Sequence, residues 1–268
     1  MITHTTTGAV DGFSIHTFSA DAHGLCGNSH VISGPTESLM IDSQFLLADA
    51  AAMTALIKQH CAPLKHIFVT HAHPDHYFGL QAVLDACPGA QVVATAAVVT
   101  DIVATFAAKR AFWLAKYGAE LPTAPVLPSA LHTDHLLLDG ARVDVHAFGP
   151  AEGLNDCVAW FAPAHALFVG DLAYNREHAW MGEMQLGLWQ QAIVACQQRF
   201  ASAQHLYPGH GAPAGPELFA ETAHYLASFA AAVAQGGAPA AIAARIFEQF
   251  PDYGIPEFVH FGVAKWLQ

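Results

Sequence analysis

Hydrophobic positions along the chain follow two periods, and the period changes from segment to segment. Short apolar runs predict β-strands. The predicted strands span 13–19, 28–33, 38–45 (a strand that runs into a turn), 66–70, 90–95, 157–162 and 166–171. Longer stretches with apolar residues three and four apart predict helices. These span 46–60, 75–86, 96–117 (one helix or a pair), 185–201, 216–235, 239–250 and 256–267.

Residues 135–149 carry a strong hairpin signal. Two alternating runs flank Asp139-Gly140, and Asp-Gly is a preferred pair in tight hairpin turns because both positions need a positive φ. Along the chain, strands first follow one another and then alternate with helices, and this order occurs twice. The pattern therefore predicts two sheets packed face to face with helices outside, in one domain spanning 1–268.

The composition limits the classes of partner. Of the 268 residues, 53% are hydrophobic and 12% are charged, which is typical of a folded globular protein. The formal net charge is −12 and the 10 Lys and Arg residues are scattered, so we expect no nucleic-acid partner. No apolar run reaches the roughly 18 residues of a membrane span. We expect a small-molecule substrate, and the oligomeric state is open, with a homodimer through helices 216–268 as one option.

The first residues and the cysteines bear on the compartment. Residues 1–13 are polar and lack the basic and apolar regions of a signal peptide, although a chain that has lost its signal would look the same. The 5 cysteines are odd in number and none is at CxxC spacing, which favours reduced thiols. We therefore expect a cytoplasmic protein.

The stretch THAHPDH (70–76) places three histidines and an aspartate within six positions. His71 and His73 lie two apart at an extended strand end, so both rings point the same way. Asp75 and His76 lie at the mouth of the next helix and face a second point. Imidazole and carboxylate are ligands of divalent transition metals. One short loop is thus expected to aim two ligands at each of two metal positions, as in two-metal hydrolysis.

This stretch resembles the T-H-x-H-x-D-H signature of the metallo-β-lactamase fold superfamily. Three other stretches resemble further motifs of that family in the expected order: MIDSQF (40–45), ALFVGD (166–171) and LYPGHG (206–211). The resemblance extends from about residue 12 to residue 212. It implies an α/β protein, a four-layer αββα sandwich with helices 216–268 packed on it, and a binuclear metal centre at one edge between the sheets. It also implies that Asp171 bridges the metals and that His210 is a further ligand.

The chain departs from the family pattern in the loop after the hairpin. Family members usually carry there a third histidine for the first metal, but residues 147–163 contain none and Glu152 aligns with its position. Either Glu152 ligates the metal with His71 and His73, which we favour because carboxylate is a legitimate ligand, or the first site is weak or vacant. His146, six residues earlier on the hairpin strand, is a third candidate.

A glutamate at this position changes the expected charge of the centre. Two divalent ions with Asp75, Asp171 and Glu152 leave a formal charge of +1, where a histidine at position 152 would leave +2. A carboxylate also shifts the preference toward harder metals. We expect two divalent metal ions, with zinc as the first choice and manganese or iron as the alternatives.

The resemblance implies a hydrolase in which a hydroxide that bridges the two ions cleaves a small ester, lactone, thioester or amide. Asp171 would position the ions, and Asp75 would orient the nucleophile and accept its proton. The sequence has no G-x-S-x-G motif, so a serine nucleophile is not expected. Two rival functions are open: a di-iron oxidoreductase of the same fold, and a non-catalytic metal-binding or sensor protein.

Weaker signals point to residues around the site. Asn175 and His178, which follow Asp171, are candidate substrate-binding residues, and Asn28 in the first glycine-rich loop is another. Asp156 either orients a metal-ligand histidine or caps a turn. The aromatic residues of 105–117 are candidates for an apolar roof over the pocket, with ordinary core packing as the alternative.

Overall fold

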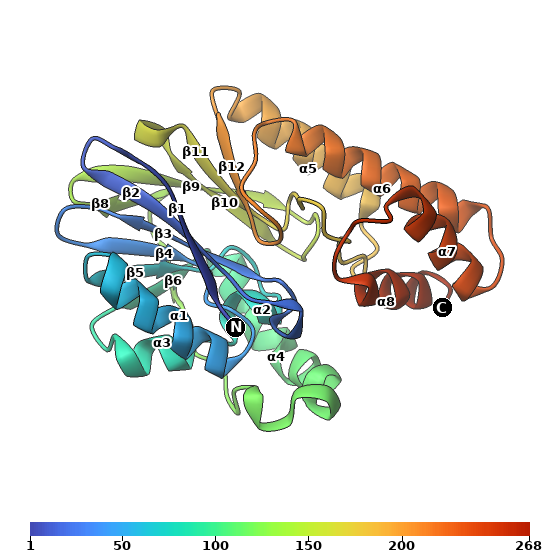
Figure 1. Ribbon diagram of the computed structural model, residues 1–268, viewed down its shortest axis with the longest axis horizontal. Coiled ribbons are helices and arrows are strands. Elements are labelled where there is room, and N and C mark those ends of the chain that lie inside the picture. Colours follow the sequence, from blue (N-terminus) through green and yellow to red (C-terminus); the bar gives the residue numbers. More distant parts are fainter.

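Two β-sheets lie face to face with helices on their outer sides, as Figure 1 shows. The computed structural model describes residues 1–268 apart from the side chains at positions 8 and 9. The first sheet has the strand order β1-β2-β3-β4-β5-β6-β7 and the second has the order β12-β11-β10-β9-β8. Helices α1 and α3 lie on the outer side of the first sheet, and α5 lies along the second (Figure 1). This arrangement confirms the predicted αββα sandwich.

The strands of the first sheet are β1 (Thr3–Val10), β2 (Phe13–Ser19), β3 (Asn28–Ser33), β4 (Ser38–Ile41), β5 (Leu64–Phe68), β6 (Gln91–Ala94) and β7 (Ser129–Ala130). Those of the second are β8 (His135–Leu138), β9 (Ala141–Gly149), β10 (Asp156–Phe161), β11 (Ala166–Gly170) and β12 (His205–Pro208). The helices are α1 (Leu47–His60), α2 (Pro74–Tyr77), α3 (Leu80–Ala86), α4 (Ala96–Tyr117), α5 (Leu186–Arg199), α6 (Leu218–Ala234), α7 (Pro239–Gln249) and α8 (Pro256–Trp266).

The inner strands are buried on both faces, which explains their continuous apolar sequences. All residues of β4, β10 and β11 are buried, and β4, β5, β6 and β7 pair in parallel, as expected for strands covered by helices. The predicted hairpin is confirmed: β8 pairs with β9 across Asp139 and Gly140, whose φ angles of 48° and 81° are those of a tight left-handed turn.

Several elements differ from the sequence prediction, among them the strands β7 and β12, which were not predicted. The helix predicted over 75–86 is divided into α2 and α3 at Gly79, whose N–H donates to the Gln44 carbonyl at 3.0 Å. A Cβ at Gly79 would lie 2.1 Å from the Ser43 carbonyl oxygen. The two backbone segments therefore lie closer together than a residue with a side chain would allow. Strand β1 was not predicted, because its polar sequence THTTTGAV lacks an apolar run; pairing with β2 supplies its order.

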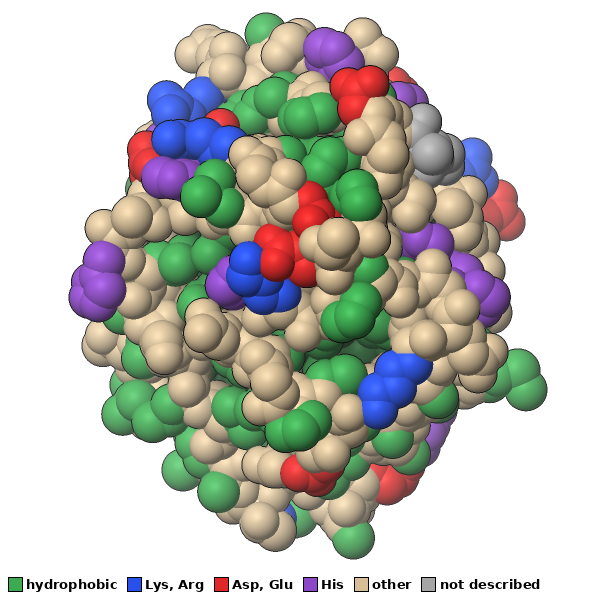
Figure 2. All heavy atoms as spheres, turned by 90° about the vertical axis from the view of Figure 1, so that its left-hand side faces the viewer, with side chains coloured by type: hydrophobic (Ala, Val, Ile, Leu, Met, Phe, Trp, Pro, Cys, Tyr) green, Lys and Arg blue, Asp and Glu red, His purple; other side chains and the backbone are tan. Residues whose placement is uncertain are grey.

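The end of the molecule that carries the β8–β9 turn has a mixed surface. Figure 2 shows this end, where basic side chains are dispersed and several lie beside acidic ones. Arg142 pairs there with Asp134 at 3.0 Å, and Lys65 pairs with Glu37 at 2.5 Å. Among the helices that the structure describes, none combines the length and apolar composition needed to cross a bilayer.

The C-terminal helices bring the end of the chain back toward α4. Helix α6 runs beside α5, and α8 lies across from α4 at the opposite end of the sandwich from the hairpins (Figure 1). The Trp266 indole N–H donates to the Met181 carbonyl at 2.9 Å, and the rings of Phe112 on α4 and Phe261 on α8 are 5.4 Å apart. These contacts enclose the edge between the two sheets.

Candidate metal centre

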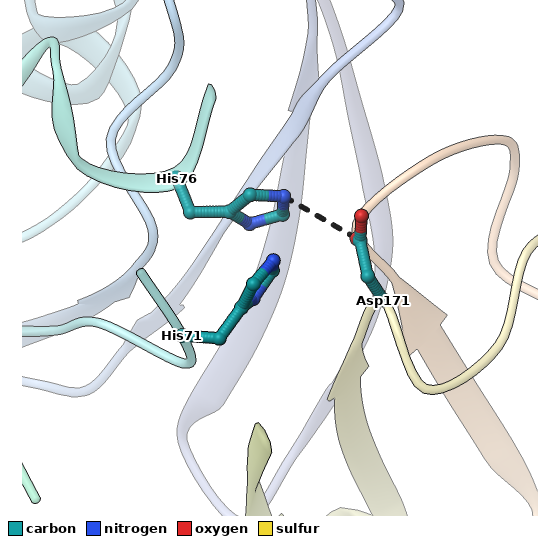
Figure 3. Close-up of side chains that lie close together, drawn as sticks. All are labelled: His71, His76 and Asp171. Carbon is teal, nitrogen blue, oxygen red and sulfur yellow. Dashed lines mark ion pairs between the residues drawn. The ribbon is translucent and has the colours of Figure 1, made fainter. Parts of the chain in front are cut away.

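Acidic and imidazole side chains converge at the edge of the sandwich where strands of both sheets end. His71 and His73 follow β5, His76 lies on α2, and Asp171 follows directly on β11. Figure 3 shows the His76 ring directed at the Asp171 carboxylate, with the His71 ring beside it. The His76 Nε2 atom is 3.3 Å from Asp171 Oδ1. The two halves of the site therefore come from different sheets.

The ligand atoms form three overlapping groups, within each of which all atoms lie within 4.8 Å of one another. The groups are His71, His73 and Glu152; Asp75, His76 and His210; and His71, His76 and Asp171. All of these residues are buried. The first two groups bring together the residues predicted for the two metal positions, and the third joins Asp171 to one histidine of each.

Several of these atoms have no other partner, which tests whether the residues suit a cation. Among the described side chains, the buried atoms that lack a hydrogen-bond partner outside the cluster include His71 Nε2, His76 Nε2, Glu152 Oε2, Asp171 Oδ1 and His210 Nε2. Buried polar atoms are normally satisfied, and leaving one unpaired costs about 1–3 kcal/mol. Because these five converge from four parts of the chain, the donor set fits divalent metal ions.

Asp42 fixes the orientation of two of the imidazoles. Its Oδ2 atom accepts from the Thr70 hydroxyl at 2.8 Å and lies 2.8 Å from Nδ1 of His76. The Thr70 oxygen is in turn 3.0 Å from Nδ1 of His71. A carboxylate that accepts the Nδ1 proton leaves Nε2 bare and directed into the site. Asp42 lies in the stretch MIDSQF (40–45), but no local pattern there predicts this role.

His210 is held in the same way from the opposite side. Its Nδ1 atom lies 3.0 Å from the Leu25 carbonyl, which accepts the proton and frees Nε2. The preceding Gly209 is needed for close packing, because a Cβ there would lie 2.0 Å from Asp171 Oδ1. The backbone of the PGHG loop can therefore approach the carboxylate only where a glycine stands.

Glu152 lies where the sequence alignment placed it. Its Oε2 atom is 2.8 Å from His73 Nδ1 and 3.4 Å from His71 Nε2. Asp156 accepts from the Gly153 N–H at 2.8 Å and so caps the turn that carries Glu152. His146 lies on β9 with its ring against Phe148 and belongs to none of the ligand groups formed by described residues.

The charges in the cluster are strongly coupled. Burial raises the pKa of the Glu152 carboxyl. Burial opposes protonation of His73, but Glu152 outweighs it and raises the pKa of His73. Burial, followed by His76 and His73, holds the pKa of His71 well below its usual value, so this imidazole is neutral. A neutral imidazole beside carboxylates is the form that a metal ion binds.

Three more residues contact the cluster in roles that were not predicted from the sequence. Tyr174 donates its hydroxyl to Asp171 and stacks on the His210 ring at 5.1 Å. Glu183 lies 3.3 Å from Nε2 of His73. Lys109 on α4 donates to the Ala72 carbonyl, between the two histidines, at 2.8 Å. Tyr174 alone had a local signal, since it lies three residues after Asp171; the other two come from distant segments.

The three predicted substrate-binding residues lie outside the pocket lining that the structure describes. His178 is buried against Tyr225, whose hydroxyl is 3.0 Å from its Nδ1. Asn175 donates to the Ala212 carbonyl at 2.8 Å, and Asn28 donates to the Pro208 carbonyl at 3.0 Å. These last two contacts support the loop that carries His210. Substrate contact by these residues stays a prediction that the geometry does not favour.

A pocket of about 530 Å³ opens over the ligand cluster. Its floor includes His73, Asp75, Glu152 and Asp171. Its walls come from α4, from α8 and from the loop that carries Trp180 and Glu183, and they include the aromatic side chains Phe112, Trp113, Trp180, Phe258 and Phe261. The volume lies in the range of small-molecule sites.

Comparisons with known proteins agree with this architecture. A family model described as the metallo-beta-lactamase superfamily matches residues 25–217. A metallo-beta-lactamase from Pontibacter korlensis superposes with a TM-score of 0.65 at 22% identity, covering 84% of this chain and 99% of that one. A Pseudomonas aeruginosa metallo-beta-lactamase in its mono-zinc form gives 0.62 at 22% identity, with coverages of 84% and 95%. One from Hirschia baltica gives 0.60 at 20% identity, with coverages of 82% and 96%.

Proposed function

The chain belongs to the metallo-beta-lactamase superfamily, and on that premise we propose that it hydrolyses a small ester, lactone, thioester or amide with the help of two divalent metal ions. The observation that carries the proposal is the convergence of unpartnered buried ligand atoms at the floor of the pocket. His71, His73 and Glu152 would hold one ion. Asp75, His76 and His210 would hold the other, with Asp171 between the two.

Divalent ions, when bound, supply Lewis acidity and make water a usable nucleophile at neutral pH. In the overall reaction, water adds to the acyl carbon, the bond from that carbon to oxygen, sulfur or nitrogen breaks, and a carboxylic acid and an alcohol, thiol or amine leave. Zinc is the first choice, and the Glu152 carboxylate favours manganese or iron as alternatives.

The protein's own residues have distinct tasks in this proposal. Asp75 lines the pocket, and its Oδ2 atom lies 3.1 Å from His210 Nε2; it is placed to orient water and to accept a proton. Asp171 would hold the two halves of the site at a fixed spacing. The Tyr174 hydroxyl lies in the same pocket and can donate to a substrate oxygen as well as to Asp171.

Metal analysis of protein purified without added metal tests this proposal. Two equivalents of zinc, manganese or iron per chain are expected, together with hydrolysis of at least one member of a panel of esters, lactones, thioesters and amides. Two equivalents of iron with redox-active absorbance and no hydrolysis would point instead to a di-iron oxidoreductase.

Substitution of Glu152 tests the ligand assignment. Glu152→Ala is expected to lose metal from one position, whereas Glu152→His is expected to keep or tighten zinc binding and to change activity. Glu248→Ala, which removes an exposed glutamate on α7, is the matched control and should keep full metal content. Unchanged metal content in Glu152→Ala would reject Glu152 as a ligand.

A further inference from the structure

The pocket over the metal centre has two chemically different ends. The carboxylates Asp75, Glu152 and Asp171 gather at its floor, with Lys109 and Glu183 nearby. Phe112, Trp113, Trp180, Phe258 and Phe261 form the aromatic wall. A molecule that fills the pocket would therefore place a polar, reacting group on the floor and an apolar group against the aromatic wall.

The aromatic wall is one continuous cluster that joins α4 to α8. Phe261 lies 5.4 Å from Phe112, 5.8 Å from Trp113 and 6.0 Å from Trp180, measured between ring centroids. Trp180 is 5.4 Å from Phe258. Such edge-to-face contacts hold the rings in fixed positions, so little order has to be gained when a ligand binds.

Packing of α8 on α4 does not by itself account for this wall. Phe112 is 52% exposed although it belongs to the cluster and lines the pocket. A phenyl group that served only to attach α8 would be covered by it, because leaving apolar area in water forfeits about 25 cal/mol per Å². Because Phe112 lines the pocket, an apolar ligand bound there would cover part of its exposed surface.

The wall also lies partly outside the region that the family shares. The family model ends at residue 217, whereas α8 begins at Pro256. Phe258 and Phe261 therefore lie outside the segment that matches the family model. Differences in such a wall, above the same catalytic floor, are a means of choosing among substrates that undergo the same reaction.

We propose that the pocket selects carbonyl substrates whose acyl group carries an aromatic ring or a branched apolar chain, bound between α4 and α8 against Phe112 and Phe261. This inference rests on the hydrolase function proposed above. The carbonyl carbon lies over the floor near Asp75 and Asp171, and the apolar group extends along the aromatic wall. Short acyl groups leave the wall exposed to water and gain none of this binding.

The test compares acetyl and phenylacetyl thioesters of one leaving group with the metal-loaded protein. The phenylacetyl compound is expected to have a kcat/KM at least about tenfold higher, since apolar groups in such pockets discriminate by about 10- to 200-fold. Phe112→Ala is expected to lower kcat/KM for the phenylacetyl thioester more than for the acetyl thioester, and so to remove most of this preference. Val103→Ala, which removes an exposed apolar side chain from the same helix outside the pocket lining, is the control.

A binding measurement separates this inference from the proposed function. Phenylacetate, the product acid, is expected to change the fluorescence of Trp113 and Trp180, and acetate at the same concentration is not. If no thioester is cleaved but phenylacetate binds and Phe112→Ala weakens that binding at least tenfold, the hydrolase function fails and the pocket assignment stands. If both thioesters are cleaved equally well and Phe112→Ala changes nothing, the function stands and this inference is overturned.

Discussion

Asp42 offers a sharp test of the metal centre, because one of its oxygen atoms holds the His76 ring directly and the His71 ring through the Thr70 hydroxyl. Its Oδ2 atom faces the Thr70 hydroxyl and the His76 ring, each at 2.8 Å, and Oδ1 accepts from the Thr70 N–H at 2.9 Å. Asp42→Asn keeps the size of the side chain but offers one oxygen only. If that oxygen keeps the hydrogen bond from the Thr70 N–H, the side-chain NH₂ group takes the place of Oδ2. It then faces two donors, the Thr70 hydroxyl and the Nδ1–H of His76.

The predicted consequence is a change of tautomer at the metal ligands. With no acceptor for Nδ1, the proton of His76 moves to Nε2, the atom that would bind the ion. The Thr70 hydroxyl, which links Asp42 to His71 at 3.0 Å, loses its own acceptor as well. Loss of such an orienting partner typically weakens metal binding 10- to 100-fold, which corresponds to about 1.4–2.7 kcal/mol. The folded protein should also lose about 1–3 kcal/mol, because donors buried at this position stay unpaired.

Chelator competition measures the dissociation constant of each ion, and urea unfolding of metal-free protein measures the loss of stability separately. Asp252→Asn, an exposed aspartate after α7, is the control and should change neither quantity. Metal affinity within twofold of the wild type in a folded Asp42→Asn protein would refute the reasoning. A loss of stability alone would assign Asp42 a role in folding and none in ligand orientation.

Two further predictions concern Tyr174 and His30. Tyr174→Phe removes the hydroxyl that donates to Asp171. We expect an unchanged metal content and a kcat reduced at least tenfold at a similar KM. A reduced metal content would show instead that the hydroxyl serves only to hold Asp171. Burial lowers the pKa of His30 from 6.5 to about 4. Between pH 6.5 and about 4 the folded state therefore binds fewer protons than the unfolded state. The free energy of unfolding falls as the pH is lowered through this range. The full shift corresponds to about 3 kcal/mol. Urea unfolding of metal-free protein should show a shallower pH dependence in His30→Gln, and equal slopes would exclude His30 as the cause.

The fold could be predicted from the sequence wherever local pattern and burial agree. The strands β3, β4, β10 and β11 are buried along their whole length, so their apolar runs are unambiguous. The prediction was wrong at Gly79, because the close approach of the Ser43 carbonyl that divides the helix depends on a segment 36 residues earlier. Strand β1 is ordered by its pairing with β2, and this pairing could not be predicted from the polar sequence of β1.

The candidate metal centre could be predicted to the extent that its candidate ligands occur in compact motifs. His71, His73, Asp75 and His76 lie on one loop, and their mutual placement follows from the geometry of a strand that turns into a helix. Glu152 was a harder case, since only its position relative to the hairpin pointed to it. Its 2.8 Å approach to His73 required two sheets to meet.

The residues proposed to select the substrate are distributed along the chain differently from the candidate metal ligands. The ligands lie within residues 71–210, inside the part of the chain that matches the family model. The aromatic wall instead joins Phe112, in a helix between two strands of the first sheet, to Phe261, near the end of the chain. Each residue alone is an unremarkable apolar position on a helix. Only the return of α8 across α4 turns them into one surface, so the sequence can indicate metal chemistry while the proposed specificity of the site depends on a long-range contact.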